Sequence, residues 1–287
     1  MDNLIGKRLD GRYSIESLVG VGGMANVYRG TDLKTGNQIA VKVLKDEFLD
    51  NEELVRRFKN ESKAISILSH PNIVKVYDVS VTDKLQYIVM EYVDGITLKE
   101  YLKQRGGALT WKETVHFATQ ILSALQHAHS KGIIHRDVKP SNIYLNAQGH
   151  FLLGDLGIAK IDDLKYCTMP ESMLSSYSAP ELFSLLGTIE PTTDIYSVGL
   201  ILYRIFNGNH APFEDENTSA KAADRRRVTG EALPVPMYAD YEISEIILKA
   251  CAFQPADRYQ SPQELKDALV EYMKRNQVDD TLIVPPI

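Results

Sequence analysis

The amino-acid sequence predicts an α+β protein with two lobes, a small β-rich lobe followed by a larger, mainly helical one. Up to about residue 91, segments rich in β-branched and aromatic residues indicate strands, with one helical segment among them. Beyond residue 95, apolar residues recur at helical spacing. With 287 residues, 44% of them apolar, the chain is long enough for two lobes. The seam between two lobes is a common place for a ligand.

The first lobe is predicted from three strand segments and one helix. The strand segments cover residues 13–20, 26–45 and 85–93, and the second folds into a hairpin at Thr35-Gly36-Asn37. The helix covers residues 52–68, where Leu54, Phe58, Ile65 and Leu68 recur on one face. Residues 91–95 then form a hinge to the second lobe.

The second lobe is predicted from a series of helices. A short helix over residues 98–105 ends at Gly106-Gly107. Thr110, with Glu113 three residues later, forms a capping box that opens a long helix through His129. Further helical segments are predicted over residues 179–186, 194–207, 244–252 and 263–275. Residues 276–287 are expected to be a flexible tail.

Composition excludes several classes of protein. A net charge of −6 argues against a general nucleic-acid binder, and the basic run Lys221–Arg227 is interpreted as a solvated helix face rather than an anion site. Only two cysteines occur, which indicates a reducing compartment. The N-terminus does not resemble a signal peptide, and the longest apolar span, Ile195–Phe206, is too short to cross a bilayer. We therefore expect a cytoplasmic protein without a membrane segment.

Two features of the first lobe each allow two interpretations. The glycines of GVGGMANV, residues 20–27, either bring backbone N–H groups close to phosphate oxygens or only form a hairpin. Lys42 lies between Val41 and Val43, so it either faces outward or faces the cleft, where a desolvated ammonium group requires an anion. Glu61, on the following helix, is a candidate partner that would fix the lysine.

Four polar residues in the second lobe form a catalytic constellation. In HRDVKPSN, Asp137 is suited to accept or orient a hydroxyl proton, and Lys139 is suited to neutralise a transferring phosphoryl group. Asn142 offers a neutral oxygen to a divalent cation, and Asp155 in LLGDLG offers an anionic one. Each alone suits a surface turn. The four in this order between apolar segments favour a phosphoryl-transfer site.

The order of these motifs resembles the protein kinase family, in particular the eukaryotic-like Ser/Thr protein kinases of bacteria, over residues 12–272. The matching residues are Gly20, Gly22, Val27, Lys42 in IAVK, Glu61, HRDVKPSN, Asp155-Leu156-Gly157, SAPE (178–181), Asp194 and Arg258. The resemblance implies a two-lobed kinase fold with an antiparallel sheet and one helix in the N-lobe. It places the N-lobe at about residues 1–91, the hinge at 91–95 and the C-lobe at 96–275.

The resemblance also implies an activity, which is transfer of the γ-phosphoryl group of ATP to Ser and Thr hydroxyls of protein substrates. Lys42, positioned by Glu61, would hold the nucleotide phosphates, and Asp137 would orient the acceptor. Lys139 is typical of Ser/Thr enzymes. Asn142 and Asp155 would hold Mg²⁺, with Mn²⁺ as an alternative ion. The implied ATP-binding residues are Gly20, Val21, Gly22, Gly23, Val27, Ala40, Lys42, Met90, Glu91 and Val93, and the implied structural anchors are Glu181, Asp194 and Arg258.

Three positions depart from the family pattern. Ala25 replaces the third glycine of the loop and Leu156 replaces the usual Phe, and we expect both to be tolerated. Met173-Leu174 replaces Gly-Thr, and the threonine of the family hydrogen-bonds the catalytic Asp and Lys, which a leucine cannot do. An ATP-binding regulator, or pseudokinase, is therefore the alternative to an active kinase. A small-molecule phosphotransferase is a third interpretation, which SAPE, Asp194 and Arg258 oppose because they shape a platform for protein substrates.

The resemblance places an activation segment over residues 155–181. In the family, the arginine at the position of Arg136 gathers a phosphorylated activation segment by charge-assisted contacts. We expect autophosphorylation at Thr168, with Tyr166, Ser172 and Ser175 as weaker candidates. Self-association for phosphorylation in trans is a further expectation.

Overall fold

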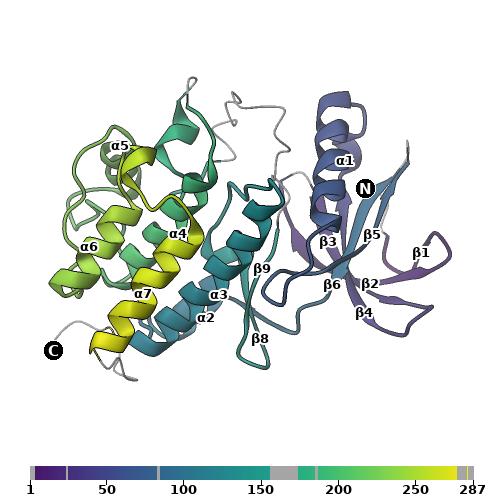
Figure 1. The fold of residues 1–287 in the computed structure, drawn as a ribbon. Helices are drawn as coiled ribbons and strands as arrows, with labels where there is room; N and C mark the ends of the chain where they lie inside the picture. The colour runs from purple at the N-terminus through teal and green to yellow at the C-terminus, as the bar shows by residue number, and fades with distance from the viewer. Residues whose placement is uncertain are drawn as a thin grey trace.

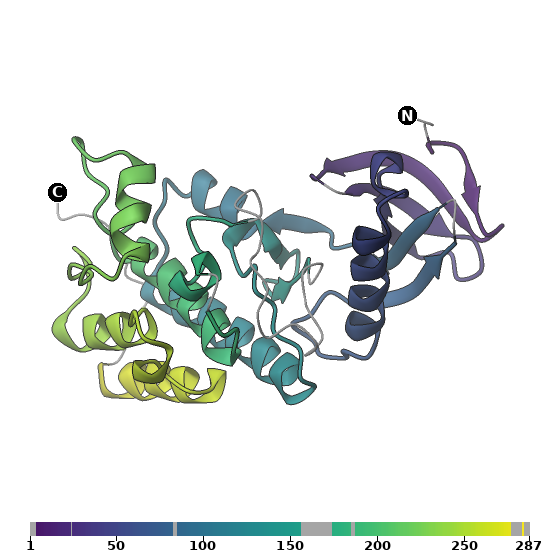
Figure 2. The same cartoon turned by 90° about the horizontal axis from the view of Figure 1, so that it is seen from above.

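The computed structural model describes residues 4–23, 25–82, 85–155, 174–184, 187–276 and 283. For eight of these residues, all in helix or strand, only the backbone is described and not the side chain: Glu53, Leu54, Arg57, Asn60, Glu61, Lys63, Ala64 and Val81. The described residues form a small β-rich lobe and a larger helical lobe (Figures 1 and 2). Among the described residues, every helix is too short or too polar to cross a lipid bilayer.

The small lobe is an antiparallel six-stranded sheet with one long helix beside it (Figure 1). Its strands are β1 (Arg8–Leu9), β2 (Tyr13–Val21), β3 (Ala25–Asp32), β4 (Gln38–Leu44), β5 (Val76–Val81) and β6 (Gln86–Glu91), in the spatial order β1-β2-β3-β4-β6-β5. The helix α1 (Glu52–Ser66) contacts β5. The predicted hairpin is confirmed between β3 and β4, where Gly36 has a φ of +74°. The strand signal of β5 was missed.

Alternation along β4 decides which way Lys42 faces. Val41 and Val43 belong to a buried cluster on one face of the sheet, together with Tyr13 and Val89. Because successive side chains of a strand point to opposite faces, Lys42 shares the other face with its neighbour Leu44, which packs with Phe58 of α1. The outward-facing interpretation of Lys42 is therefore excluded.

A second, three-stranded antiparallel sheet begins the large lobe. Its strands, in spatial order, are β7 (Gly95–Thr97), β8 (Ile143–Asn146) and β9 (Phe151–Leu153). Backbone bonds tie β9 to the segment after α1, since Val74 N donates to Leu153 O at 2.9 Å and Leu153 N to Asn72 O at 2.8 Å. The catalytic-loop residues lie just before β8, and Asp155 lies just after β9.

The rest of the large lobe consists of helices around α4, the most completely buried of the described helices (Figure 1). The helices are α2 (Leu98–Gln104), α3 (Trp111–Ser130), α4 (Pro191–Ile205), α5 (Ala220–Val228), α6 (Tyr241–Ala250) and α7 (Pro262–Asn276). A methyl group on Gly199 of α4 would lie 2.8 Å from both Ala250 Cβ and Cys251 Sγ. The close contact of α4 with the end of α6 therefore requires glycine at this position.

Several sequence-based expectations have definite outcomes. The capping box of Thr110 and Glu113 is confirmed, with Glu113 N donating to Thr110 Oγ1 at 3.0 Å. The helix predicted over residues 179–186 is wrong, because a single 3₁₀ turn, Pro180–Phe183, ends where Ser184 turns to extended backbone. Within the segment predicted as a tail, Ile283 is 3% exposed and its N–H donates to Leu109 O.

Candidate active site

The catalytic loop brings three predicted residues together. Asp137 is buried, and its Oδ2 lies 2.7 Å from Lys139 Nζ. Asn142 Nδ2 donates to the same oxygen at 3.0 Å and to Asp137 O at 2.9 Å. Pro140 begins a 3₁₀ turn that carries Asn142 back toward Asp137. The acid, the base and the amide of the motif therefore form one hydrogen-bonded group.

The other carboxylate oxygen of Asp137 stands apart from this group. Within the described part of the chain, Asp137 Oδ1 is buried and accepts no hydrogen bond. A buried acceptor without a donor is costly, so it is unusual in a structural position and suits one that receives a hydroxyl group. This oxygen can therefore accept a hydrogen bond from a hydroxyl group that enters the site.

Asp194, at the start of α4, holds the backbone of the catalytic loop. Its carboxylate accepts from His135 N at 2.8 Å and Arg136 N at 2.7 Å, and His129 Nε2 lies 2.7 Å from it. Burial acts to raise the pKa of Asp194. The hydrogen bond from His129 and the interactions with His129 and His135 outweigh burial, so the pKa lies below its ordinary value. Arg136 has a φ of +66°, a strained conformation that the two backbone hydrogen bonds to Asp194 help to hold.

His135 connects the catalytic loop to the segment that carries Asp155. Its Nε2 lies 3.0 Å from Gly154 O, and its Nδ1 accepts from Asp137 N at 3.2 Å. These partners assign the proton of the neutral ring to Nε2. Gly154 N also donates to Asn142 O at 2.8 Å, so Asp155 and Asn142 lie on adjoining backbone.

Asp155 faces the small lobe. It has a φ of +49°, and its carboxylate forms an ion pair with Lys42 of β4. The ammonium group of Lys42 lowers the pKa of Asp155 below its ordinary value, although burial acts in the opposite direction. Lys42 and Asp155 thus meet across the seam between the lobes, as the cleft-facing interpretation expected.

Asn142 and Asp155 have the chemistry of a magnesium site. The side-chain nitrogen of Asn142 donates hydrogen bonds to Asp137. The side-chain carbonyl oxygen of Asn142 therefore points away from the Asp137 carboxylate. A neutral amide oxygen beside an ionised carboxylate is the kind of hard donor set that Mg²⁺ prefers. The residues therefore fit the Mg²⁺ ion that the resemblance implied.

The strands of the small lobe order the predicted nucleotide-binding residues. Val27 is the cross-strand partner of Lys42, and Ala40 is the partner of Met90. Lys42, Met90 and Asp155 also line a cavity of about 30 Å³. The remaining predicted ATP-binding residues lie in or beside β2 and β6, namely Gly20, Val21, Gly22, Gly23, Glu91 and Val93.

The glycine-rich segment follows the backbone that its sequence requires. Gly22 N donates to Ala25 O at 2.9 Å, and a methyl group on Gly22 would lie 2.9 Å from that oxygen. Ala25, which stands in place of a third glycine, is a buried residue of β3. Ala25 is therefore an ordinary buried strand residue. The position at which a side chain would come too close to the backbone is Gly22, not residue 25.

Some predicted residues lie outside what the structure describes. Glu61 belongs to α1, but its side chain is not among those described. Leu156, Thr168 and Met173 also lie outside the described residues, whereas Leu174 is described and half-buried. The roles of Glu61 and Thr168 stay predictions.

Glu181 and Arg258 form the buried ion pair that the resemblance implied. Arg258 Nη1 and Nη2 lie 2.8 Å from Glu181 Oε1 and Oε2, a bidentate arrangement. Thr193 Oγ1 also donates to Glu181 Oε1 at 2.8 Å. The pair joins the SAPE turn to the segment before α7.

Arg227 was missed by the sequence analysis. The solvated helix face proposed for Lys221–Arg227 is wrong at this residue, which is 2% exposed. Its Nη1 donates to Ser178 O at 2.7 Å and to Tyr196 Oη at 3.2 Å. Ala223, one turn earlier in α5, is also buried, and this apolar neighbour was the available signal for an inward-facing position.

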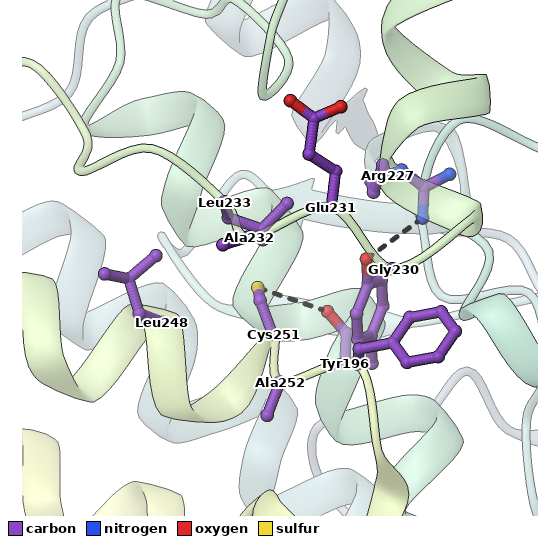
Figure 3. Close-up of a pocket in the computed structure, with 10 residues that line it drawn as sticks. Tyr196, Arg227, Gly230, Glu231, Ala232, Leu233, Leu248, Cys251 and Ala252 are labelled. Carbon is purple, nitrogen blue, oxygen red and sulfur yellow. Dashed lines mark hydrogen bonds between the residues drawn. The ribbon is translucent and has the colours of Figure 1, made fainter.

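Arg227 and Tyr196 also line a cavity of about 180 Å³ in the large lobe (Figure 3). The cavity lies between α4, the end of α6 and the segment after α5. Its lining includes Cys251, whose Sγ lies 3.9 Å from Tyr196 O, and the apolar side chains of Leu233 and Leu248. It is separate from the seam between the lobes.

The chain belongs to the protein kinase domain family, whose model matches residues 13–270. It is 38% identical over 266 residues to the serine/threonine-protein kinase PrkC of Bacillus subtilis, covering 92% of this chain and 41% of that protein. It is 40% identical over 268 residues to a probable serine/threonine-protein kinase of Clostridium perfringens, covering 91% of this chain and 38% of the relative. The chain therefore spans about two fifths of the length of these relatives.

Solved structures confirm the fold. The PknI kinase domain of Mycobacterium tuberculosis superimposes with a TM-score of 0.71 at 28% identity, over 94% of this chain and 99% of that domain. The two-lobed α+β kinase fold that the sequence predicted is therefore correct.

Proposed function

We propose that the chain is the catalytic domain of an Mg-ATP-dependent Ser/Thr protein kinase. The observation that carries this proposal is the geometry around Asp137. One carboxylate oxygen is held by Lys139 and Asn142, and the other is buried without a donor among the described residues. The named Ser/Thr kinases among the relatives support the same activity.

Each residue of the site has a role in this reaction. Asp137 Oδ1 accepts a hydrogen bond from the hydroxyl group of the substrate protein and takes up its proton as the hydroxyl oxygen bonds to the γ-phosphorus of ATP. The bond from the γ-phosphorus to the β–γ bridging oxygen breaks in the same transfer, and ADP is the leaving group. Lys139, held next to Asp137, offsets negative charge on the phosphoryl group in transfer. Lys42, on the other side of the seam, is placed to hold the nucleotide phosphates when ATP separates it from Asp155.

Asn142 and Asp155 would hold the metal ion. Bound Mg²⁺, or Mn²⁺ in its place, supplies positive charge that neutralises the phosphate oxygens. The carboxylate of Asp155 is ionised at neutral pH, since the ordinary pKa of an aspartate is about 3.9, and the ionised form is the one that a hard cation requires.

The pseudokinase alternative rests only on Met173-Leu174. The residues of the catalytic loop are present and correctly grouped, and the named relatives are kinases, so an enzyme is favoured. The buried pair of Glu181 and Arg258 supports a protein substrate over a small molecule, because it braces the platform that follows the activation segment.

Protein substrates, autophosphorylation at Thr168 and self-association for reaction in trans complete the proposal. A cytoplasmic location of this catalytic domain belongs to it as well, since its substrate ATP and the reducing compartment inferred from cysteine usage are both found there.

Intact-protein mass tests the proposal. Dephosphorylated chain, incubated with MgATP, should gain one or more phosphate masses, and peptide mapping should place one at Thr168. Asp137→Asn should reduce the rate by about 10²–10⁴-fold, because it removes the proton acceptor. Its ATP affinity should stay unchanged, since Asp137 does not contact the nucleotide base in this proposal. A mass gain equal in both proteins would exclude Asp137 from the role, and no gain in the wild type would favour the regulator.

A further inference from the structure

Leu174 occupies the position at which the kinase family carries a threonine. A leucine side chain has no hydroxyl group, so it cannot hydrogen-bond Asp137 or Lys139. In the structure, the half-buried Leu174 packs instead against an apolar cluster formed by Ile134, Leu182 and Ile189. Residue 174 therefore has a contact of a different kind from the hydrogen bond expected of the family.

The apolar cluster joins three parts of the site. Ile134 precedes His135 in the catalytic loop, Leu182 lies in the 3₁₀ turn of the SAPE motif, and Ile189 lies just before α4. All three side chains are buried. Because Leu174 packs on this cluster, it ties the end of the activation segment to the loop that carries Asp137.

The catalytic pair does not need residue 174 for its own geometry. Lys139 Nζ lies 2.7 Å from Asp137 Oδ2, so the two side chains hold each other directly. The apolar contact can therefore place the docking segment without altering the acid and base.

The residues after Leu174 are fixed by separate contacts. Ser178 N donates to Ser175 O at 3.0 Å, which closes a turn. Ser197 Oγ of α4 donates to Tyr177 O at 2.9 Å, and Arg227 Nη1 donates to Ser178 O at 2.7 Å. Figure 3 shows Arg227, from α5, beside Tyr196, which belongs to α4 as Ser197 does. The segment is thus held by hydrogen bonds at its far end and by the apolar cluster at Leu174.

We infer that Leu174 is a positioning residue, whose packing on Ile134, Leu182 and Ile189 sets the substrate-docking segment against the catalytic loop in place of a hydroxyl hydrogen bond. This inference rests on the proposed kinase activity. It accounts for a catalytic site that keeps its geometry although the threonine of the family is missing.

A matched pair of variants tests the apolar contact. Leu174→Asn keeps the approximate shape of the side chain but makes it polar, whereas Leu174→Met keeps it apolar and of similar volume. With MgATP and dephosphorylated casein as the acceptor, kcat/KM for casein should fall about tenfold in Leu174→Asn. It should stay within about twofold of wild type in Leu174→Met. In both variants the KM for ATP and the rate of ATP hydrolysis without casein should remain unchanged.

A double-mutant cycle locates the contact. Ile189→Ala removes the other side of the packing from a residue outside the catalytic loop, and it should lower kcat/KM for casein in the wild-type background. In the Leu174→Asn background the same substitution should change kcat/KM little, because the contact is already lost. The inference would be overturned if the fall in kcat/KM for casein in the double variant equalled the product of the falls in the two single variants.

The outcomes separate this inference from the proposed function. Equal activity of Leu174→Asn and Leu174→Met overturns the inference alone. A parallel loss of ATP hydrolysis and casein phosphorylation in Leu174→Asn also overturns it, because the residue would then serve only the general fold. Absence of phosphate transfer to casein and to the chain itself by the wild type overturns the proposed function, and this inference with it.

Discussion

Asp194 and Glu181 are both buried carboxylates of the large lobe, but they are satisfied by different partners. Asp194 accepts from the backbone N–H groups of His135 and Arg136 and lies beside His129. Glu181 forms a bidentate ion pair with Arg258. The first carboxylate therefore orders a loop, whereas the second neutralises a buried cation.

The difference separates function from stability. A buried ion pair that loses one partner leaves an uncompensated charge, which is strongly destabilising. A carboxylate that organises backbone donors next to a reacting group controls where that group lies. We therefore expect changes at Glu181 and Arg258 to act mainly on stability, and changes at Asp194 to act mainly on activity.

The largest expected effect on stability comes from the ion pair, and its two halves should differ. Arg258→Met leaves the Glu181 carboxylate buried with Thr193 as its remaining donor among the described residues, and it should cost about 3–5 kcal/mol of unfolding free energy. Glu181→Gln should cost less, about 2 kcal/mol, because Arg258 still donates to backbone carbonyl groups. Those acceptors are Ala252 O, Thr192 O and Phe253 O.

Urea denaturation of the two variants checks this order. Equal costs, or a larger cost for Glu181→Gln, would mean that the carbonyl groups do not hold Arg258 in the absence of its carboxylate.

The next prediction concerns Asp194. In Asp194→Asn, one of the two oxygen acceptors becomes an N–H₂ group that faces backbone donors, so the catalytic loop should shift. We expect kcat to fall about 10²-fold, with a loss of about 1–3 kcal/mol in unfolding free energy. Steady-state kinetics and urea denaturation measure the two effects. Asp215→Asn, at an exposed position, is the control, and an Asp194→Asn variant of wild-type activity would contradict the role of the loop contacts.

The contribution of Asp194 to stability should depend on pH. The pKa of Asp194 is lowered in the folded protein, so its contribution to stability is present above the ordinary value of about 3.9 and is lost as the pH falls through the lower folded value. The difference in unfolding free energy between wild type and Asp194→Asn should therefore shrink below about pH 4. Urea midpoints of both proteins across this range provide the test, and a difference independent of pH would contradict it.

The smallest expected effect is at Thr193, whose hydroxyl group donates to Glu181 at 2.8 Å and accepts from Glu190 N at 3.4 Å at the start of α4. Thr193→Val keeps the shape of the side chain but removes both hydrogen bonds, of which the second is long, and should cost about 1 kcal/mol. Kinase activity should be retained, because Arg258 still holds the carboxylate. Thermal unfolding and casein phosphorylation check both parts, and a loss of activity as large as that of Asp194→Asn would remove the distinction between the two carboxylates.

Much of the site was predictable because its signals are local in the chain. Asp137, Lys139 and Asn142 belong to one short motif, and Thr110 with Glu113 form a capping box within one turn. The resemblance also placed Glu181 opposite Arg258 and identified Asp155 as the partner of Asn142. The failed helix over residues 179–186 shows the limit of apolar periodicity next to proline, since Pro180 begins a turn that ends within a few residues.

The sequence by itself determined the two-lobed fold class, the order of the motifs and the residues proposed for the chemistry, because these depend on residue type and spacing. Only the tertiary structure decided that Lys42 faces the seam, that Arg227 is buried against Ser178, and that Leu174 packs on Ile134, Leu182 and Ile189. These facts depend on which segments meet. The physical reason is that burial and apolar packing are properties of neighbours brought together from distant parts of the chain, and no short stretch of sequence contains them.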